Sequence, residues 1–169
     1  MAHILTKFRI PKYDYSASLL IIGTADLCEK VSEALHQCAK GKKWNIAVHK
    51  CESISEITRF KINFSIDYII LVNDWTTQSL SEVETNICLI DEHYIHFGAI
   101  CLINCQGISK TVGLNAHKSS KICDKYNIRF LSTNISKPQN CIQLGNRILN
   151  LVEAVFGITS GIPIIGFPL

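Results

Sequence analysis

The chain has 169 residues, of which 47% are hydrophobic and only 18% are charged, against about 25% charged in a typical soluble domain. A composition this apolar excludes intrinsic disorder, and it predicts that a partner covers part of the surface. The net charge of +3 is too small to indicate a nucleic-acid-binding protein.

The first predicted elements are a buried strand, an amphipathic helix and an edge strand. Residues 18–23 read SLLIIG, an aliphatic run typical of a strand buried on both faces. Over residues 25–40, apolar side chains recur every three or four positions, which predicts a helix with Thr24 as its N-cap and Gly41 as its stop. Residues 44–50 then alternate between apolar and polar, as expected of a half-exposed edge strand.

The middle of the chain contains two further buried strands. Residues 51–66 have no clear pattern and predict a loop with at most a short helix, whereas DYIILVN at 67–73 predicts a strand. From 76 to 97, apolar residues are spaced three and four apart, which predicts one long helix. AICLIN at 99–104 predicts the next buried strand, and a loop containing glycine follows over 106–114.

The last part of the chain continues the alternation. Residues 115–126 predict a short amphipathic helix and residues 128–132 a strand. Pro138 opens the final helix, whose apolar face includes Ile142, and Gly157 closes it. This order predicts an α/β fold with three layers, in which a mostly parallel five-stranded sheet carries helices on both faces. We expect a single domain, 1–169, with an N-terminal arm over 1–17 and an apolar C-terminal tail over 158–169.

The loop after the first predicted strand is where a nucleotide-binding α/β protein would bind phosphate. A phosphate loop, GxxxxGK(S/T), needs a second glycine for close approach, a lysine for charge and a hydroxyl for magnesium. Aligned on Gly23, these three places hold Cys28, Glu29 and Lys30. Asp26 and Glu29 also put negative charge where a phosphate would lie. Phosphate binding is therefore not expected at this loop.

The loop that would read a guanine base is also incomplete. The pattern NKxD would follow the strand at 99–104, and Asn104 keeps its first position. Cys105 replaces the lysine, and Gly107 replaces the carboxylate that would pair with the base. The stretch between Cys51 and Asp67 is too short for a strand, a DxxG loop and a switch helix.

No other catalytic site is complete in the sequence. Asp74 follows a buried strand like the aspartate of a phospho-receiver domain, but the acidic pair and the lysine of such a domain are missing. Cys105 or Cys123 would need an activating base to act as a nucleophile. The alternative to a non-catalytic protein is a cryptic α/β enzyme or a small-ligand or nucleotide-binding protein that uses Asp74, Asn104 or a cysteine.

The cysteines and the histidines favour a structural interpretation. The eight cysteines lie mostly in apolar periodic segments, which favours buried thiols in a reducing compartment over a disulfide framework. His93 and His96 lie near Cys88, but no second pair of ligands has the spacing of a zinc site. The first 17 residues lack the apolar run of a signal peptide, so we expect an intracellular protein in the cytosol or the nucleus.

Several runs together resemble the centromere protein M family. They are LLIIGTADLCEKVSEAL, IDYIILVN, SLSEVETNICLIDEHYIHFGAICLIN and RILNLVEAVFGITSGIPIIG, and they span roughly residues 18–166. The resemblance implies a degenerate small-GTPase-like fold, a pseudo-GTPase that binds neither nucleotide nor another cofactor. It also implies a non-catalytic scaffold subunit of the inner kinetochore in the nucleus.

The resemblance further implies partners and contact residues. The family's main partner is centromere protein I, which it stabilises in a subcomplex with centromere proteins H and K. One partner contact corresponds to Phe97, just before the strand at 99–104, and another to Ile165 in the apolar tail. We add Ile162 and Ile164 because they are adjacent to Ile165 in the tail. No nucleic acid, membrane or metal is implied.

Overall fold

The computed structural model describes residues 16–59, 65–74, 77–105 and 113–158. This part of the chain forms a five-stranded sheet with the strand order β2-β1-β3-β4-β5, in which every neighbouring pair is parallel. The strands are β1 (Ser16–Ile22), β2 (Asn45–Cys51), β3 (Tyr68–Asn73), β4 (Ile100–Asn104) and β5 (Arg129–Ser132). The predicted α/β class and strand number are confirmed, and β1 begins two residues earlier than the predicted strand.

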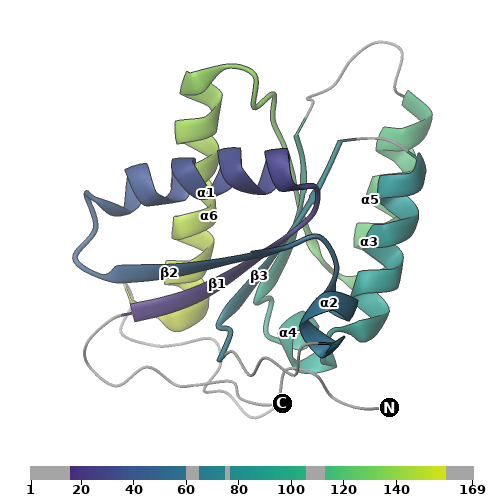
Figure 1. The fold of residues 1–169 in the computed structure, drawn as a ribbon, viewed down its shortest axis with the longest axis horizontal. Helices are drawn as coiled ribbons and strands as arrows, with labels where there is room; N and C mark the ends of the chain where they lie inside the picture. The colour runs from purple at the N-terminus through teal and green to yellow at the C-terminus, as the bar shows by residue number, and fades with distance from the viewer. Residues whose placement is uncertain (1–15, 60–64, 75–76, 106–112, 159–169) are drawn as a thin grey trace.

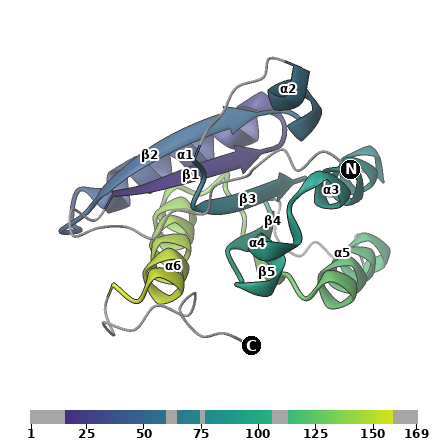
Figure 2. The same cartoon turned by 90° about the horizontal axis from the view of Figure 1, so that it is seen from below.

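Helices cover both faces of the sheet. They are α1 (Ala25–Ala39), α2 (Ile54–Arg59), α3 (Thr77–Leu89), α4 (Glu92–His96), α5 (Gly113–Tyr126) and α6 (Pro138–Phe156). α1 and α6 cross on one face, and α3 and α5 lie side by side on the other (Figures 1 and 2). The predicted three-layer arrangement is therefore confirmed, and α2 is the short helix anticipated between residues 51 and 66.

The core follows from the aliphatic strands. All residues of β3 and β4 are buried, because helices cover both faces of these central strands. β2 lies at the edge, and its residues are half-buried or exposed, as its alternating sequence predicts. Trp44, just before β2, donates from Nε1 to Glu153 Oε1 at 3.0 Å and so ties this edge to α6.

The prediction of one helix over 76–97 is wrong, because the segment contains two helices. α3 ends at Leu89, and Asp91 begins α4 with extended backbone angles (φ −62°, ψ 132°). The Asp91 side chain accepts a hydrogen bond from the His93 backbone N–H at 3.0 Å, which satisfies a free donor of the new helix. The apolar spacing runs unbroken through this join, so periodicity alone could not reveal it.

The helix ends follow the sequence only in part. Gly157 closes α6 in the left-handed conformation (φ +65°), as predicted. Thr24 occupies the N-cap position of α1, but its side chain makes no capping hydrogen bond. α1 ends at Ala39, with Lys40 in the right-handed helical conformation, so Gly41 is not a left-handed stop. Ile142, assigned to the buried face of α6, is 37% exposed.

The eight cysteines are all free thiols. The four that are buried are Cys28, Cys101, Cys105 and Cys123, on α1, on or beside β4 and on α5. Cys88 on α3 is exposed. Among the helices in the described ranges, none combines the length and the apolar character needed to cross a bilayer.

Candidate functional site

The end of β1 passes very close to β3 at Gly23. A Cβ atom on Gly23 would lie 2.6 Å from the Val72 backbone oxygen, where the two atoms would overlap. The Gly23 backbone N–H donates to the Cys51 backbone oxygen at 3.1 Å, which joins the end of β1 to β2. Strand packing alone therefore requires glycine here, and this glycine is not a sign of phosphate binding.

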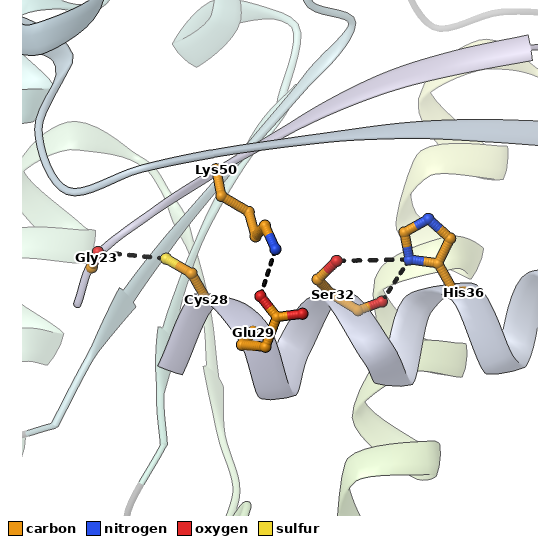
Figure 3. A network of polar contacts seen from close by, with 6 residues as sticks. All are labelled: Gly23, Cys28, Glu29, Ser32, His36 and Lys50. Carbon is orange, nitrogen blue, oxygen red and sulfur yellow. Dashed lines mark hydrogen bonds and ion pairs between the residues drawn. The ribbon is translucent and has the colours of Figure 1, made fainter. Parts of the chain in front are cut away.

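The places of the missing phosphate-loop residues are occupied by mutually paired groups. Cys28 Sγ donates to the backbone oxygen of the glycine that ends β1, at 3.3 Å. Glu29 of α1 forms an ion pair with Lys50 of β2 (Figure 3). The Lys30 ammonium lies 2.7 Å from a carboxylate oxygen of Asp26, which is four residues earlier on α1. Carboxylates of α1 thus neutralise the two lysines of this region.

A hollow of about 360 Å³ opens where β1 and β2 end and α1 begins. The charged residues that line it are Glu29, Lys50, Glu52 and Glu56. Among the described residues of the lining, three carboxylates against one ammonium group give a net charge of −2. These residues would repel an anion, because the one cation among them is already paired with Glu29. The phosphate position of nucleotide-binding α/β proteins is therefore acidic in this chain.

Asn104 and Cys105, at the position of a base-reading loop, form hydrogen bonds that connect neighbouring strands of the sheet. Asn104 is fully buried, and its side-chain amide donates to Ser132 Oγ at 3.0 Å. Cys105 is also buried, and its backbone N–H donates to the Asn73 backbone oxygen at 2.9 Å. Gly107 lies outside the described residues. The described part of this loop therefore joins β3, β4 and β5.

Two residues at this edge were not singled out from the sequence. Lys50 of β2 forms its ion pair with Glu29 of α1, and no local motif marks it. Asn73 pairs in register with Asn104 and is fully buried, and its side-chain amide has no hydrogen-bond partner among the residues that the structure describes. The signal for Asn73 was present, because both DYIILVN and AICLIN end a buried strand in asparagine.

The geometry does not support a cysteine nucleophile. Burial raises the pKa of Cys105 and of Cys123 to about 12, and that of Cys28 to about 11. A thiol with such a pKa is protonated at neutral pH, whereas the thiolate is the nucleophile. Asp74, the other candidate, is half-buried at the end of β3.

The histidines near Cys88 lie on the short helix α4. His93 and His96 are both exposed, and His93 Nδ1 lies 2.7 Å from Asp91 Oδ1. Within the ranges given above, no three side chains of the metal-binding types come together. The structure thus gives His93 a local partner in the N-cap of its own helix.

Phe97 lies where the chain turns from α4 into β4. Its side chain is half-buried, and its ring centroid lies 6.2 Å from that of His93. Gly98 follows in the left-handed conformation (φ +64°), which turns the chain toward the sheet. Part of the Phe97 side chain is therefore accessible at the surface. The other expected contact residues, Ile162, Ile164 and Ile165, lie outside the described residues.

Comparison with known proteins identifies the family. A model of the centromere protein M family matches residues 2–167 of the chain. A comparison with curated proteins gives no match. The family match spans nearly the whole chain and agrees with the resemblance inferred from the sequence. It places the protein at the centromere and kinetochore in the nucleus, in chromosome segregation. The chain therefore belongs to the centromere protein M family.

Proposed function

We propose that this protein is a non-catalytic scaffold subunit of the inner kinetochore, a pseudo-GTPase that does not bind nucleotide. The acidic hollow at the end of β1 carries the proposal. A bound nucleotide needs free backbone N–H groups and a free cation at this position. Here the Lys50 ammonium is paired with Glu29, and Glu52 and Glu56 add further negative charge. Protonated buried thiols likewise argue against nucleophilic catalysis.

The partner that we propose is centromere protein I, in a subcomplex with centromere proteins H and K. The apolar composition of the chain supports a covered surface, and half-buried Phe97 offers one contact. The apolar tail, with Ile162, Ile164 and Ile165, is the second proposed contact.

We expect no thermal stabilisation by nucleotide. A ligand present at about 100 times its Kd stabilises the folded state by about 2.7 kcal/mol, which raises the Tm of a domain this size by about 5–10 °C. For this protein, GTP or GDP with Mg²⁺ should leave the Tm unchanged, because the hollow repels phosphate. Differential scanning fluorimetry at increasing nucleotide concentration measures the effect.

A rebuilt loop provides the matched control for this experiment. The triple variant Cys28→Gly, Glu29→Lys and Lys30→Thr restores the GxxxxGKT spacing from Gly23. It removes the Glu29 carboxylate and leaves two cations at the hollow. We expect a larger shift with GDP for this variant than for the natural chain. A concentration-dependent shift of several degrees in the natural chain would contradict the pseudo-GTPase proposal.

Substitutions at the proposed contacts should weaken the complex and leave the fold intact. We expect Phe97→Ala and Ile165→Glu each to lower co-purification with centromere protein I by about tenfold or more, because replacing a hot-spot residue of an interface costs about 2 kcal/mol or more. Quantitative pull-down from co-expressing cells measures the loss, and circular dichroism checks the fold.

Ile142→Ala is the matched control, because Ile142 is an apolar side chain with 37% exposure on a different element, α6. It should co-purify like the natural chain. Undiminished recovery of both contact variants would show that the assigned surface is wrong.

A further inference from the structure

Helix α5 carries a row of lysines on its exposed side. Lys118, Lys121 and Lys125 are all exposed, at spacings of three and four residues. With 3.6 residues per turn, these three positions fall within a sector of about 60° and extend about 10 Å along the helix. Of the buried residues described on the same helix, Ser119 and Cys123 face away from these lysines, and Ile122 lies beside them at the edge of the exposed side. We call Lys118, Lys121 and Lys125 the lysine row.

The lysine row is poorly neutralised within the molecule. Lys125 lies 3.7 Å from Glu84 of α3, and its ammonium also lies 4.6 Å from the ring centroid of Tyr126. Lys118 and Lys121 make no ion pair with any residue that the structure describes. Like charges three and four residues apart on a helix repel one another. We therefore expect opposite charge brought to Lys118 and Lys121 to relieve this repulsion.

Two lysines near α1 and α6 are paired with carboxylates. Lys42 lies 2.9 Å from Glu153 of α6, and Lys30 lies 2.7 Å from Asp26. These contacts satisfy the ammonium groups on the opposite face of the sheet, around α1 and α6. The lysine row on α5 differs from these two lysines, because Lys118 and Lys121 have no carboxylate partner among the described residues.

We propose that the lysine row is a docking surface for an acidic helical segment of a partner protein. A helix with carboxylates at positions i, i+3 and i+7 has the same rise and the same sector, so it can place one carboxylate near each ammonium. The proposal concerns α5 and is independent of the Phe97 contact at the end of α4.

A protein segment fits this surface better than a nucleic acid does. Neighbouring α3 carries Glu82 and Glu84 and has no lysine or arginine between Thr77 and Leu89. These carboxylates would repel a phosphate backbone that extends beyond the row. A nucleic-acid surface also usually has more cations than three, often including arginine. A single acidic helix can instead align with the row and leave α3 uncovered.

The test uses the full chain and a synthetic helical peptide. The peptide has about 20 residues, enough for a stable isolated helix, with glutamate at i, i+3 and i+7. A second peptide has glutamine at the same positions. Fluorescence anisotropy at low and at physiological ionic strength measures binding. We expect the glutamate peptide to bind, binding to weaken with salt, and the glutamine peptide to bind at least about tenfold more weakly.

Two variants of equal net charge locate the surface. The row variant Lys118→Gln, Lys121→Gln, Lys125→Gln should lose at least about tenfold in affinity for the glutamate peptide. The control variant Lys40→Gln, Lys43→Gln, Lys137→Gln removes three exposed lysines elsewhere and should bind like the natural chain. Equal affinity of the two variants would overturn the proposal.

A charge exchange and a nucleic-acid probe complete the test. The variant Lys118→Glu, Lys121→Glu, Lys125→Glu should lose the glutamate peptide and bind a peptide with lysine at the same positions. If this variant is folded by circular dichroism and binds neither peptide, the proposal is wrong. Tighter binding of a DNA duplex than of the glutamate peptide, lost in the row variant, would likewise overturn it in favour of a nucleic acid.

Discussion

Replacing Gly145 by valine should lower the free energy of unfolding by about 3 kcal/mol, at the upper end of the usual cost of overpacking. Gly145 lies on α6 where α6 crosses α1. A Cβ atom there would lie 2.9 Å from both the Ala34 backbone oxygen and Cys38 Sγ. The thiol can shift, but the backbone oxygen belongs to α1 and moves only with the helix. Valine would therefore push the two helices apart.

The expected loss corresponds to a fall in Tm of about 6–12 °C for a domain of this size. Urea denaturation followed by circular dichroism measures the free energy. Gly41→Val is the matched control, because a Cβ atom on Gly41 would meet only the Cys38 backbone oxygen, at 3.8 Å. The control should change stability by no more than about 0.5 kcal/mol. Equal stability of the two variants would show that α1 and α6 are not in close contact at Gly145.

Mild alkali should destabilise the protein through its buried thiols. Burial raises the pKa of Cys101 and of Cys105 to about 12, whereas a thiol in the unfolded chain has a pKa of about 8.5. Between pH 7.5 and 9.5 the unfolded state loses these protons and the folded state keeps them. The free energy of unfolding is therefore nearly unaffected by these thiols below pH 8, and it falls as the pH rises further. Each thiol contributes a loss of about 1.4 kcal/mol over this range.

The two thiols together should cost about 3 kcal/mol by pH 9.5, and the other buried cysteines act in the same direction. Urea denaturation in a reducing buffer at several pH values measures the slope. Cys101→Ala should reduce the slope, whatever its effect on stability at neutral pH. A free energy of unfolding that is constant from pH 7.5 to 9.5 would contradict this account.

Local patterns were sufficient for most of the fold. The aliphatic runs LLII and YIILV became central strands because such runs are stable only with helices on both faces. The alternation at 44–50 correctly predicted an exposed edge strand. The pattern failed at Asp91, where the apolar spacing continues but an aspartate N-cap starts a second helix. It also failed at Ile142, which the spacing assigned to the apolar face of α6 but which is 37% exposed.

The sequence was enough to predict that the phosphate-binding residues are missing from the candidate site. It was not enough to predict which side chains pair with one another there. The residues Cys28, Glu29 and Lys30 already exclude a phosphate loop, because the required glycine, lysine and hydroxyl are chemical necessities at those places. The partner of Glu29 could not be predicted, because Lys50 is 21 residues away and meets it only through the pairing of β1 with β2.

The sequence by itself therefore determined the alternation of strands and helices, the absence of a phosphate-binding motif and the family. These properties depend on residue types at short, regular spacings. The tertiary structure alone decided that Gly23 is required by the Val72 backbone, that Gly145 lets α6 approach α1, and that Lys125 is the one member of the lysine row with an ion pair among the described residues. Each of these three features depends on which segments, distant in the sequence, become neighbours in the fold. The spacing of residues along the chain does not specify those contacts.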